Sequence, residues 1–404
     1  MTLDVTTLRA HFPALASGIA FFDAPGGTQT PRVVGEAIAS ALTNPLTIPG
    51  GDAVRSEVNA AKAESAFRSA FGDFLGLPDQ GVIYGRSATQ LNYDLSRALA
   101  KTWGPKDEIV VSRLDHDSNV RPWVQAAESV GATVRWIDFD PATAEIIWQS
   151  VDDAINQKTR LVAVTAASNV LGTMPRVRAI ADAAHAVGAH LHVDAVHYAA
   201  HNLVDVPGLG ADSLVCSPYK FLGPHMAVLG ASLDVLEALR PDKLRPSSDE
   251  VPHRFELGTL PYEIMAGATA AVDFLAEIAP GAATSRREKL RNSFHAIEEH
   301  EAALRKQLEE GLAGFGDAVV VHSRAEARTP TTLITLPGRK TWDAYEFLGS
   351  RDISAPAHSS FYAYEAFRRL DLDDENAMRF GLAPYVTEAE VSRLLNGLAD
   401  FLAR

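Results

Sequence analysis

Short apolar runs alternate with helical patterns through the middle of the chain, and this alternation restricts the fold more than any other feature. Helical patterns lie near residues 88–101, 119–131, 175–188 and 196–202. Seven apolar runs typical of buried strands lie near Val82–Tyr84, Ile109–Ser112, Val134–Asp138, Leu161–Ala167, Leu191–Val196, Leu214–Ser217 and Ala227–Ala231. Such alternation predicts an α/β fold, in which helices cover both faces of a mostly parallel seven-stranded sheet.

The pattern changes near residue 284. Ser285-Arg286-Arg287-Glu288 is typical of a helix N-terminus, and apolar residues then recur at helical spacing from Leu290 to Leu312. We expect this long helix to lead into a small α+β unit with strands near residues 318–322 and 332–336 and a closing helix from about 387. The sequence therefore predicts a large domain over residues 1–284, which includes the N-terminal segment, and a small C-terminal domain over residues 285–404.

Composition limits the setting and the partners of the protein. The 404 residues are 47% hydrophobic and 22% charged, which is typical of a globular protein with an ample core. The formal net charge of −14, without a long basic tract, argues against nucleic acid and anionic membranes as partners. Neither a membrane-spanning apolar run nor a signal-peptide pattern is present. Cys216 is the single cysteine, so no intramolecular disulfide can form, and the simplest expectation is a cytoplasmic protein.

Two predicted strands end in residues that can carry chemistry. Asp194 ends the strand near Leu191–Val196, and Lys220 lies in a Pro- and Gly-rich turn between the last two strands. Ligands of open α/β sheets bind beyond the carboxyl ends of the strands, so we expect one crevice to hold both side chains. A buried lysine becomes a nucleophilic amine, and a carboxylate can keep a pyridine nitrogen protonated. The pair predicts pyridoxal phosphate, whereas the turn alone would be more typical of a surface lysine with a buried stem.

A phosphate site is predicted where a strand enters a helix. Gly85-Arg86-Ser87-Ala88-Thr89 follows an apolar run and precedes a helical pattern. The free N–H groups and the dipole of a helix N-terminus attract anions, although an ordinary cap at Ser87 or Thr89 would give the same pattern. The hydroxyl groups of Ser217 and Tyr219, beside the lysine, could add donors.

Other polar residues near strand ends could contact the cofactor ring. His116 lies just past a strand and could stack on the pyridine, and Asn169 could bond to its phenolic oxygen. Both residue types are also common in surface loops and turns. A cluster of histidines offers a rival hypothesis, because His197 and His201 stand at a spacing that can bind zinc on a helix. The metalloprotease glutamate is missing from this cluster, and we predict no metal.

Several segments, in their order and spacing, resemble the class V aminotransferase family. They are Asp194-Ala195-Val196-His197, Ser217-Pro218-Tyr219-Lys220 with Gly223-Pro224, Ser168-Asn169-Val170-Leu171-Gly172-Thr173, and Arg379 with Tyr385. From about Phe21 to the C-terminus the chain is most similar to the cysteine-desulfurase-like group. This resemblance implies a fold-type-I pyridoxal phosphate enzyme that acts on an amino acid, usually as a homodimer with the active site at the subunit interface.

The resemblance also implies roles for single residues. Lys220 resembles the Schiff-base lysine, Asp194 the partner of the pyridinium nitrogen, and His116 the ring-stacking histidine. Arg379 resembles the arginine that binds the substrate α-carboxylate, a planar pairing suited to guanidinium. The other cofactor contacts implied by the resemblance are Ala88, Thr89, Asn169, His197, Ser217 and Tyr219, together with Gly258 and Thr259 lent by the partner subunit.

The chain departs from the desulfurase pattern where the reaction is decided. His197 stands in place of a glutamine, Tyr219 in place of a histidine, and Ala88 lacks a phosphate-binding hydroxyl. The loop over residues 353–362, which in desulfurases carries the nucleophilic cysteine, has none. We therefore predict C–S lyase chemistry by β-elimination, or aminotransferase chemistry, without a protein persulfide. A true cysteine desulfurase, an amino-acid epimerase, a non-catalytic cofactor-binding protein and a zinc-dependent enzyme remain alternatives.

Overall fold

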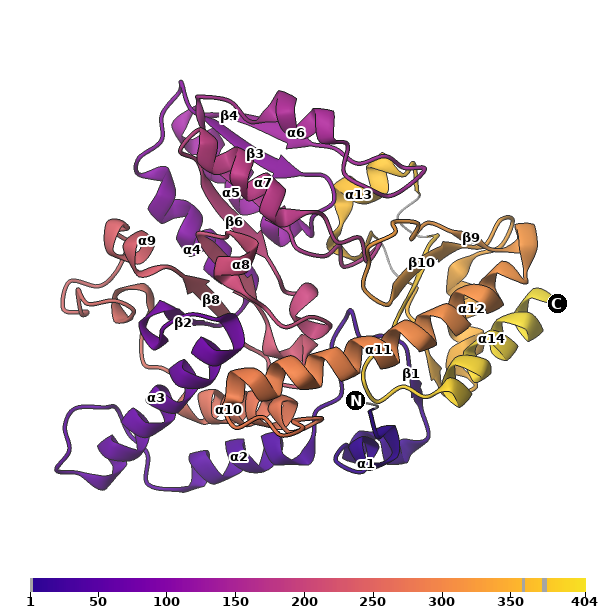
Figure 1. Ribbon diagram of the computed structural model, residues 1–404, viewed down its shortest axis with the longest axis horizontal. Helices are drawn as coiled ribbons and strands as arrows, with labels where there is room; N and C mark the ends of the chain where they lie inside the picture. The colour runs from indigo at the N-terminus through magenta and orange to yellow at the C-terminus, as the bar shows by residue number, and fades with distance from the viewer. Residues whose placement is uncertain (1–2, 358–359, 373–375) are drawn as a thin grey trace.

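The computed structural model describes residues 3–357, 360–372 and 376–404, and its largest unit is a seven-stranded sheet (Figure 1). The strand order is β2-β8-β7-β6-β5-β3-β4. Strands β4, β3, β5, β6 and β7 run parallel, whereas β8 runs antiparallel to both β7 and β2. The strands are β2 (Val82–Gly85), β3 (Glu108–Ser112), β4 (Thr133–Ile137), β5 (Thr159–Thr165), β6 (His190–Asp194), β7 (Ser213–Cys216) and β8 (Ala227–Ala231). The predicted α/β fold with a mostly parallel seven-stranded sheet is confirmed.

Alternate residues of the buried strands feed two separate hydrophobic cores. Ile109 and Leu161 pack with α4 (Ala88–Ala100) and α5 (Arg121–Val130) on one face of the sheet. Val110 and Val162 pack on the other face with α3 (Arg55–Leu75) and α7 (Val177–Ala186). Because side chains of a strand alternate between faces, a sheet covered on both sides needs apolar residues at nearly every position. This explains why these strands are continuous apolar runs in the sequence.

Several helices of the large unit were not predicted, and one predicted helix was wrong. Helix α10 (Tyr262–Ala276) packs against α2 (Arg32–Thr43) and α3, and it buries residues around most of its circumference. It therefore lacks the polar face that reveals a helical period. The helix predicted over residues 196–202 is only a single 3-10 turn, Tyr198–Ala200. Short helices α6 (Trp148–Ala154), α8 (Val206–Leu209) and α9 (Leu233–Ala238) complete the large unit.

The C-terminal part begins with the predicted long helix, α11 (Arg286–Ala313), whose N-cap Ser285 accepts a hydrogen bond from the Glu288 amide. A three-stranded antiparallel sheet follows, in the order β12-β10-β9. Strand β12 carries Arg379 between two neighbours that are fully buried. The elements are β9 (Val320–Val321), β10 (Thr331–Thr335), α12 (Thr341–Gly349), β11 (Ile353–Ser354), α13 (Tyr364–Arg369), β12 (Met378–Gly381) and α14 (Glu388–Leu402).

The N-terminal segment packs on the C-terminal part of the chain. Strand β1 (Ala20–Phe21) pairs in parallel with β11, and Asp23 forms a bridge to Gly381. Arg9, the last residue of α1 (Val5–Arg9), forms an ion pair of 2.9 Å with Glu390 of α14. In Figure 1 the strand β1 lies beside α14. The sequence did not indicate this contact, and the boundary near residue 284 stays a prediction.

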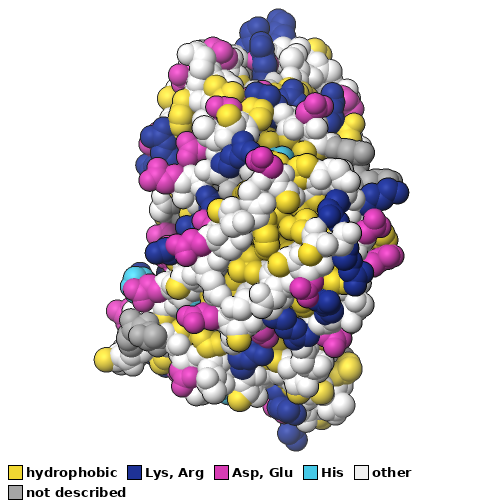
Figure 2. Space-filling model, turned by 90° about the vertical axis from the view of Figure 1, so that its right-hand side faces the viewer, with side chains coloured by type: hydrophobic (Ala, Val, Ile, Leu, Met, Phe, Trp, Pro, Cys, Tyr) yellow, Lys and Arg dark blue, Asp and Glu magenta, His cyan; other side chains and the backbone are white. Residues whose placement is uncertain are grey.

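The surface over the C-terminal elements is mixed in character. Figure 2 shows hydrophobic side chains gathered along the middle of this face, with charged side chains of both signs around them. The negative net charge is therefore not expressed as a single acidic field on this side. Among the described residues, no helix combines the length and the hydropathy needed to cross a membrane.

Candidate active site

A cavity of about 860 Å³ lies beyond the carboxyl ends of the parallel strands. Residues of the large unit and of the C-terminal part line it together. It brings together every residue predicted to bind the cofactor or the substrate, except Gly258 and Thr259. The predicted residues that line it are Ala88, Thr89, His116, Asn169, Asp194, His197, Ser217, Tyr219, Lys220 and Arg379.

Lys220 ends a 3-10 turn, Pro218–Lys220, that directly follows β7. Its Nζ donates a hydrogen bond to the carbonyl of Pro25 and lies 4.9 Å from the centre of the Tyr219 ring. Burial, and then the charge of Arg379, lower the pKa of Lys220 to about 7, against the opposing charge of Asp194. The side chain therefore supplies neutral amine near pH 7, which is the form that attacks a carbonyl.

Asp194 ends β6 and is almost completely buried. Its Oδ1 accepts a hydrogen bond of 2.8 Å from the Val196 amide. Burial raises the pKa of Asp194 to about 6, while that hydrogen bond and the charge of Lys220 oppose the rise. A buried carboxylate with one amide donor is stabilised by a cationic partner, and a protonated ring nitrogen bound in this cavity would supply one.

His116 is the N-cap of the 3-10 turn Asp117–Asn119, which lies in the loop beyond the C-terminal end of β3. Its Nδ1 accepts a hydrogen bond of 3.0 Å from the Ser118 amide, so a neutral ring carries its hydrogen on Nε2. Burial, followed by the charges of Lys220 and Arg379, lowers the pKa of His116 to about 3. The imidazole is thus neutral near pH 7 and suited to stacking on an aromatic ring.

Two buried chains of hydrogen bonds hold in place the loop that follows β3 and carries His116. His192 of β6 contacts Asn92 of α4 at 3.0 Å, and the Asn92 amide donates to the Ser118 carbonyl at 2.8 Å. Trp123 donates to Asn119, which in turn donates to Asp115 at 2.6 Å. Both chains fix the loop that positions His116, so His192 has a structural role.

The N-terminus of α4 opens into the cavity. Ser87 is its N-cap and accepts a hydrogen bond of 3.1 Å from the Gln90 amide. Ala88 and Thr89 occupy the first turn, where backbone N–H groups have no partner within the helix. This end of the cavity suits a phosphate group, and the buried Ser217 also lines the cavity.

Asn169 and His197 each leave a polar atom without a partner among the described residues. Asn169 donates from Nδ2 to the Phe361 carbonyl at 2.9 Å, but its Oδ1 is buried and unbonded. His197 Nε2 lies 2.9 Å from the hydroxyls of Thr329 and Thr331, but its Nδ1 is buried and unbonded. Buried polar groups are normally satisfied, so these two atoms fit a bound polar group such as the phenolic oxygen of pyridoxal phosphate.

Arg379 points from β12 into the cavity and is 5% exposed. It donates to the Asn169 carbonyl at 3.0 Å, and its guanidinium lies 4.2 Å from the centre of the Phe361 ring. Burial lowers the pKa of Arg379 to about 9, opposed by the charges of Asp23 and Tyr219. A buried guanidinium that stays charged at neutral pH is suited to a substrate carboxylate.

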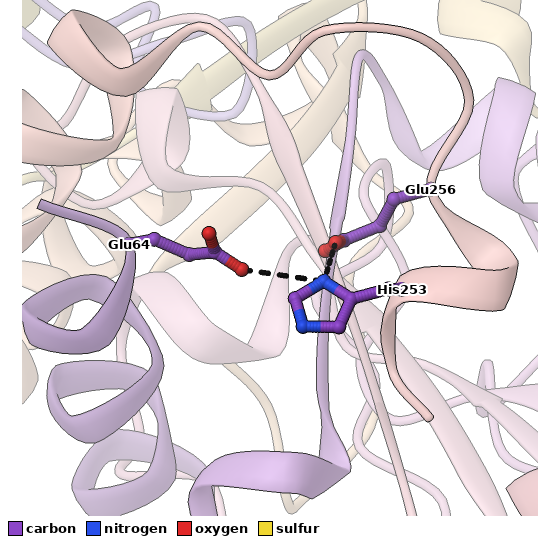
Figure 3. Close-up of side chains that lie close together, drawn as sticks. All are labelled: Glu64, His253 and Glu256. Atoms are coloured by element: carbon purple, nitrogen blue, oxygen red, sulfur yellow. Dashed lines mark ion pairs between the residues drawn. The ribbon is translucent and has the colours of Figure 1, made fainter. Parts of the chain in front are cut away.

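The histidine cluster does not form a metal site among the described residues. His201 Nδ1 bonds to Glu301 at 2.8 Å, and His197 is engaged by the two threonines. A different group, Glu64, His253 and Glu256, has ligand-like spacing and lies outside the cavity (Figure 3). Its two carboxylates already pair with the buried Arg68 at 2.6 and 2.8 Å.

Gly258 and Thr259 do not line the cavity of their own chain. They follow Glu256, which Arg68 and the Tyr84 amide hold in place at 2.8 Å each. Their role at the active site of a partner subunit stays a prediction.

The cavity also contains residues that the sequence analysis missed. Asp23 follows the N-terminal strand, and its pKa is raised by burial. Phe361 and Tyr362 lie in the loop over residues 353–362, where the missing cysteine was the only feature used for the prediction. Their aromatic character is a signal present in the sequence, whereas Asp23 is placed near the cavity by the pairing of β1 with β11, which the sequence did not indicate.

Fold and site together define a pyridoxal phosphate enzyme of the α/β type. A family model, aminotransferase class-V, matches residues 20–394, and the chain belongs to this family, whose members depend on pyridoxal phosphate. The aminotransferase-like protein FGM3 of Gibberella zeae is 28% identical over 98% of this chain and 98% of its own. A cysteine desulfurase of Enterobacter sp. is 27% identical over 98% of each chain. The crystal structure of the cysteine desulfurase CsdA from Escherichia coli shares the fold, with a TM-score of 0.87 at 22% identity over 100% of this chain and 99% of its own.

Proposed function

We propose that the protein acts on the α-carbon of an amino acid by β-elimination with C–S cleavage or by transamination, and that it forms no persulfide on its own chain. The observation that carries this proposal is the separation of lysine and thiol. Lys220 lies in the cavity, whereas Cys216, the only cysteine, is fully buried in β7 and does not line the cavity. Elimination and transamination need a lysine and an electron sink, but not a thiol.

In this proposal, different residues that line the cavity have different roles. Pyridoxal phosphate, when bound, supplies the electron sink for the α-carbanion. Lys220 would hold the cofactor and then take the α-proton of the substrate as general base. Asp194 would keep the ring nitrogen protonated, and His116 would cover the ring. Asn169 and His197 would contact the phenolic oxygen through their unbonded atoms.

Product analysis tests the proposed reaction. The purified protein, loaded with pyridoxal phosphate, is mixed separately with each amino acid, and products are identified by mass. A keto acid with ammonia indicates elimination, and a keto acid with the aminated cofactor indicates transamination. Alanine with sulfide from L-cysteine would instead identify a desulfurase, a racemised amino acid would identify an epimerase, and the absence of turnover would leave a non-catalytic binding protein.

The Cys216→Ala variant should keep the activity of the native protein. Burial, and then the charge of Asp194, raise the pKa of the Cys216 thiol, so that it is a poor nucleophile. We expect only a modest loss of stability, about 1 kcal/mol, from the missing sulfur in a packed strand. Intact mass after incubation with L-cysteine should show no added sulfur. Sulfur on the native protein that disappears in the variant together with activity would overturn the proposal.

The Arg379→Lys variant should bind amino acids more weakly. A lysine cannot replace the planar pairing of guanidinium with carboxylate, and the loss should be about 1.5–3 kcal/mol, the scale of a hydrogen bond to a charged group. Titration of the cofactor-loaded protein with an amino acid measures this change. Cofactor content should stay normal, and Arg113→Lys, a control at an ion pair with Glu365 outside the cavity, should leave the affinity unchanged. Equal affinity of Arg379→Lys and the native protein would remove Arg379 from the substrate site.

The proposed assembly is a homodimer. In it, Gly258 and Thr259, which lie outside the cavity of their own chain, would reach the phosphate site of the partner subunit. A cytoplasmic location and the absence of nucleic-acid or membrane partners stay predictions from composition.

A further inference from the structure

We infer that Phe361 and Tyr362 form the wall that receives the substrate side chain, and that Tyr362 makes the enzyme prefer amino acids with an apolar or aromatic side chain. The inference deepens the proposed function and rests on it. The two residues belong to an unusual backbone segment that precedes α13 and lines the cavity.

Three consecutive residues of this segment have left-handed backbone conformations. The φ angles are 37° at Ser360, 47° at Phe361 and 59° at Tyr362. Residues with a β-carbon rarely adopt this region, and then usually singly. Such conformations persist where surrounding contacts fix them, and they gather at ligand-binding sites. The strained backbone of this segment therefore suggests that the segment takes part in ligand binding.

The contacts of Phe361 show what fixes the segment. Its carbonyl accepts the hydrogen bond from Asn169, and its buried ring lies 4.2 Å from the guanidinium of Arg379. The ring also lies 6.4 Å from that of Phe367 in α13. Phe361 thus covers one face of Arg379 and leaves the edge of the guanidinium for a carboxylate. A substrate bound there has this ring beside it.

Tyr362 extends this aromatic wall as far as His116, because its ring contacts the imidazole. The two rings stack with their centres 5.5 Å apart and an angle of 25° between their planes. Tyr362 nevertheless remains 72% exposed, although it lines the cavity. A large aromatic surface left open in a cavity gains free energy when an apolar group covers it.

The charges around this wall favour an uncharged side chain. His116 is neutral, as described above, and Phe361 is apolar. Asp117 and Arg121, which also line the cavity, form an ion pair with each other at 3.5 Å. Lys220, Arg379 and His116 all line the same cavity as Tyr362. An α-carbon above Lys220 with its carboxylate on Arg379 would have Tyr362 beside its side chain.

The experiment measures binding of four probes to the cofactor-loaded protein through the change in its visible absorbance. The probes are L-phenylalanine, L-leucine, L-serine and L-aspartate. We expect the native protein to bind the first two more tightly. Tyr362→Ala should weaken their binding about tenfold, the scale of losing part of a buried aromatic contact, and change serine binding less than threefold. Tyr362→Phe should keep the native preference, because the ring rather than the hydroxyl makes the contact.

Tyr364→Ala is the matched control. Tyr364 is also an exposed aromatic residue, 44% exposed on α13, but it lies near Arg368 and does not line the cavity. Its loss should leave all four affinities unchanged. An equal loss for all probes in Tyr362→Ala, or a native preference for serine or aspartate, would overturn the inference while the proposed function stands. A native protein without any visible cofactor band would overturn both.

Discussion

Replacing Lys220 by alanine should abolish turnover while the protein stays folded. The variant loses both the covalent attachment of the cofactor and the proposed proton acceptor, and general acid–base catalysis alone contributes about 10²–10⁴-fold. We therefore expect activity to fall by about 10³-fold or more. The thermal midpoint should change little, because a buried amine with a lowered pKa contributes no favourable charge to folding. The measurement compares turnover, visible absorbance and thermal unfolding of native and variant proteins.

Lys101→Ala provides the control for Lys220→Ala. Lys101 lies at the C-terminal end of α4 in an exposed ion pair with Asp242, and it is absent from the cavity wall. This variant should retain native absorbance and turnover. If Lys220→Ala kept a native rate with every substrate, another group would have to move the proton.

Replacing Asp194 by asparagine should slow the reaction by about 10²–10³-fold, the effect of removing one electrostatic partner of a developing charge. The amide is nearly isosteric and can still accept from the Val196 amide, so the fold should survive. It cannot keep a ring nitrogen protonated, and the α-carbanion then loses its electron sink. The exchange of the substrate α-proton with deuterated water reports this step directly.

Asp212→Asn is the matched control for that substitution. Asp212 also contacts β6, through a hydrogen bond of 2.7 Å from the Leu191 amide, but it lies at the opposite end of the strand, away from the cavity. Its replacement should leave proton exchange unchanged. Undiminished exchange in Asp194→Asn would separate this carboxylate from the chemistry.

The large sheet was predictable because its strands must be apolar on both faces. Continuous runs such as Leu161–Ala167 stand out between helical patterns, and their boundaries agree well with β5 and its neighbours. Helix α10 was not predicted for a related reason: it is buried around most of its circumference, so its sequence shows little periodicity. The pairing of β1 with β11 joins residues more than 300 positions apart, and two-residue strands give no signal of such a contact.

The site was predictable where chemistry and strand ends coincide. Asp194, Lys220 and the start of α4 are marked in the sequence by polar residues that follow apolar runs. The role proposed for Phe361 and Tyr362 rests on their left-handed backbone conformation and on their contacts with Arg379 and His116, which the sequence does not reveal. In the same loop, His358 and Ser359 lie outside the described residues. Aromatic residues in a loop are otherwise common, so their place beside Arg379 and His116 required the structure.

Borohydride reduction of the native, cofactor-loaded protein tests whether Lys220 holds the cofactor. Reduction fixes the cofactor to the lysine that holds it, and peptide mass analysis then identifies that residue. We expect a single labelled peptide that contains Lys220, and no label in Lys220→Ala. A label on a peptide that lacks Lys220 would contradict the assignment of the site.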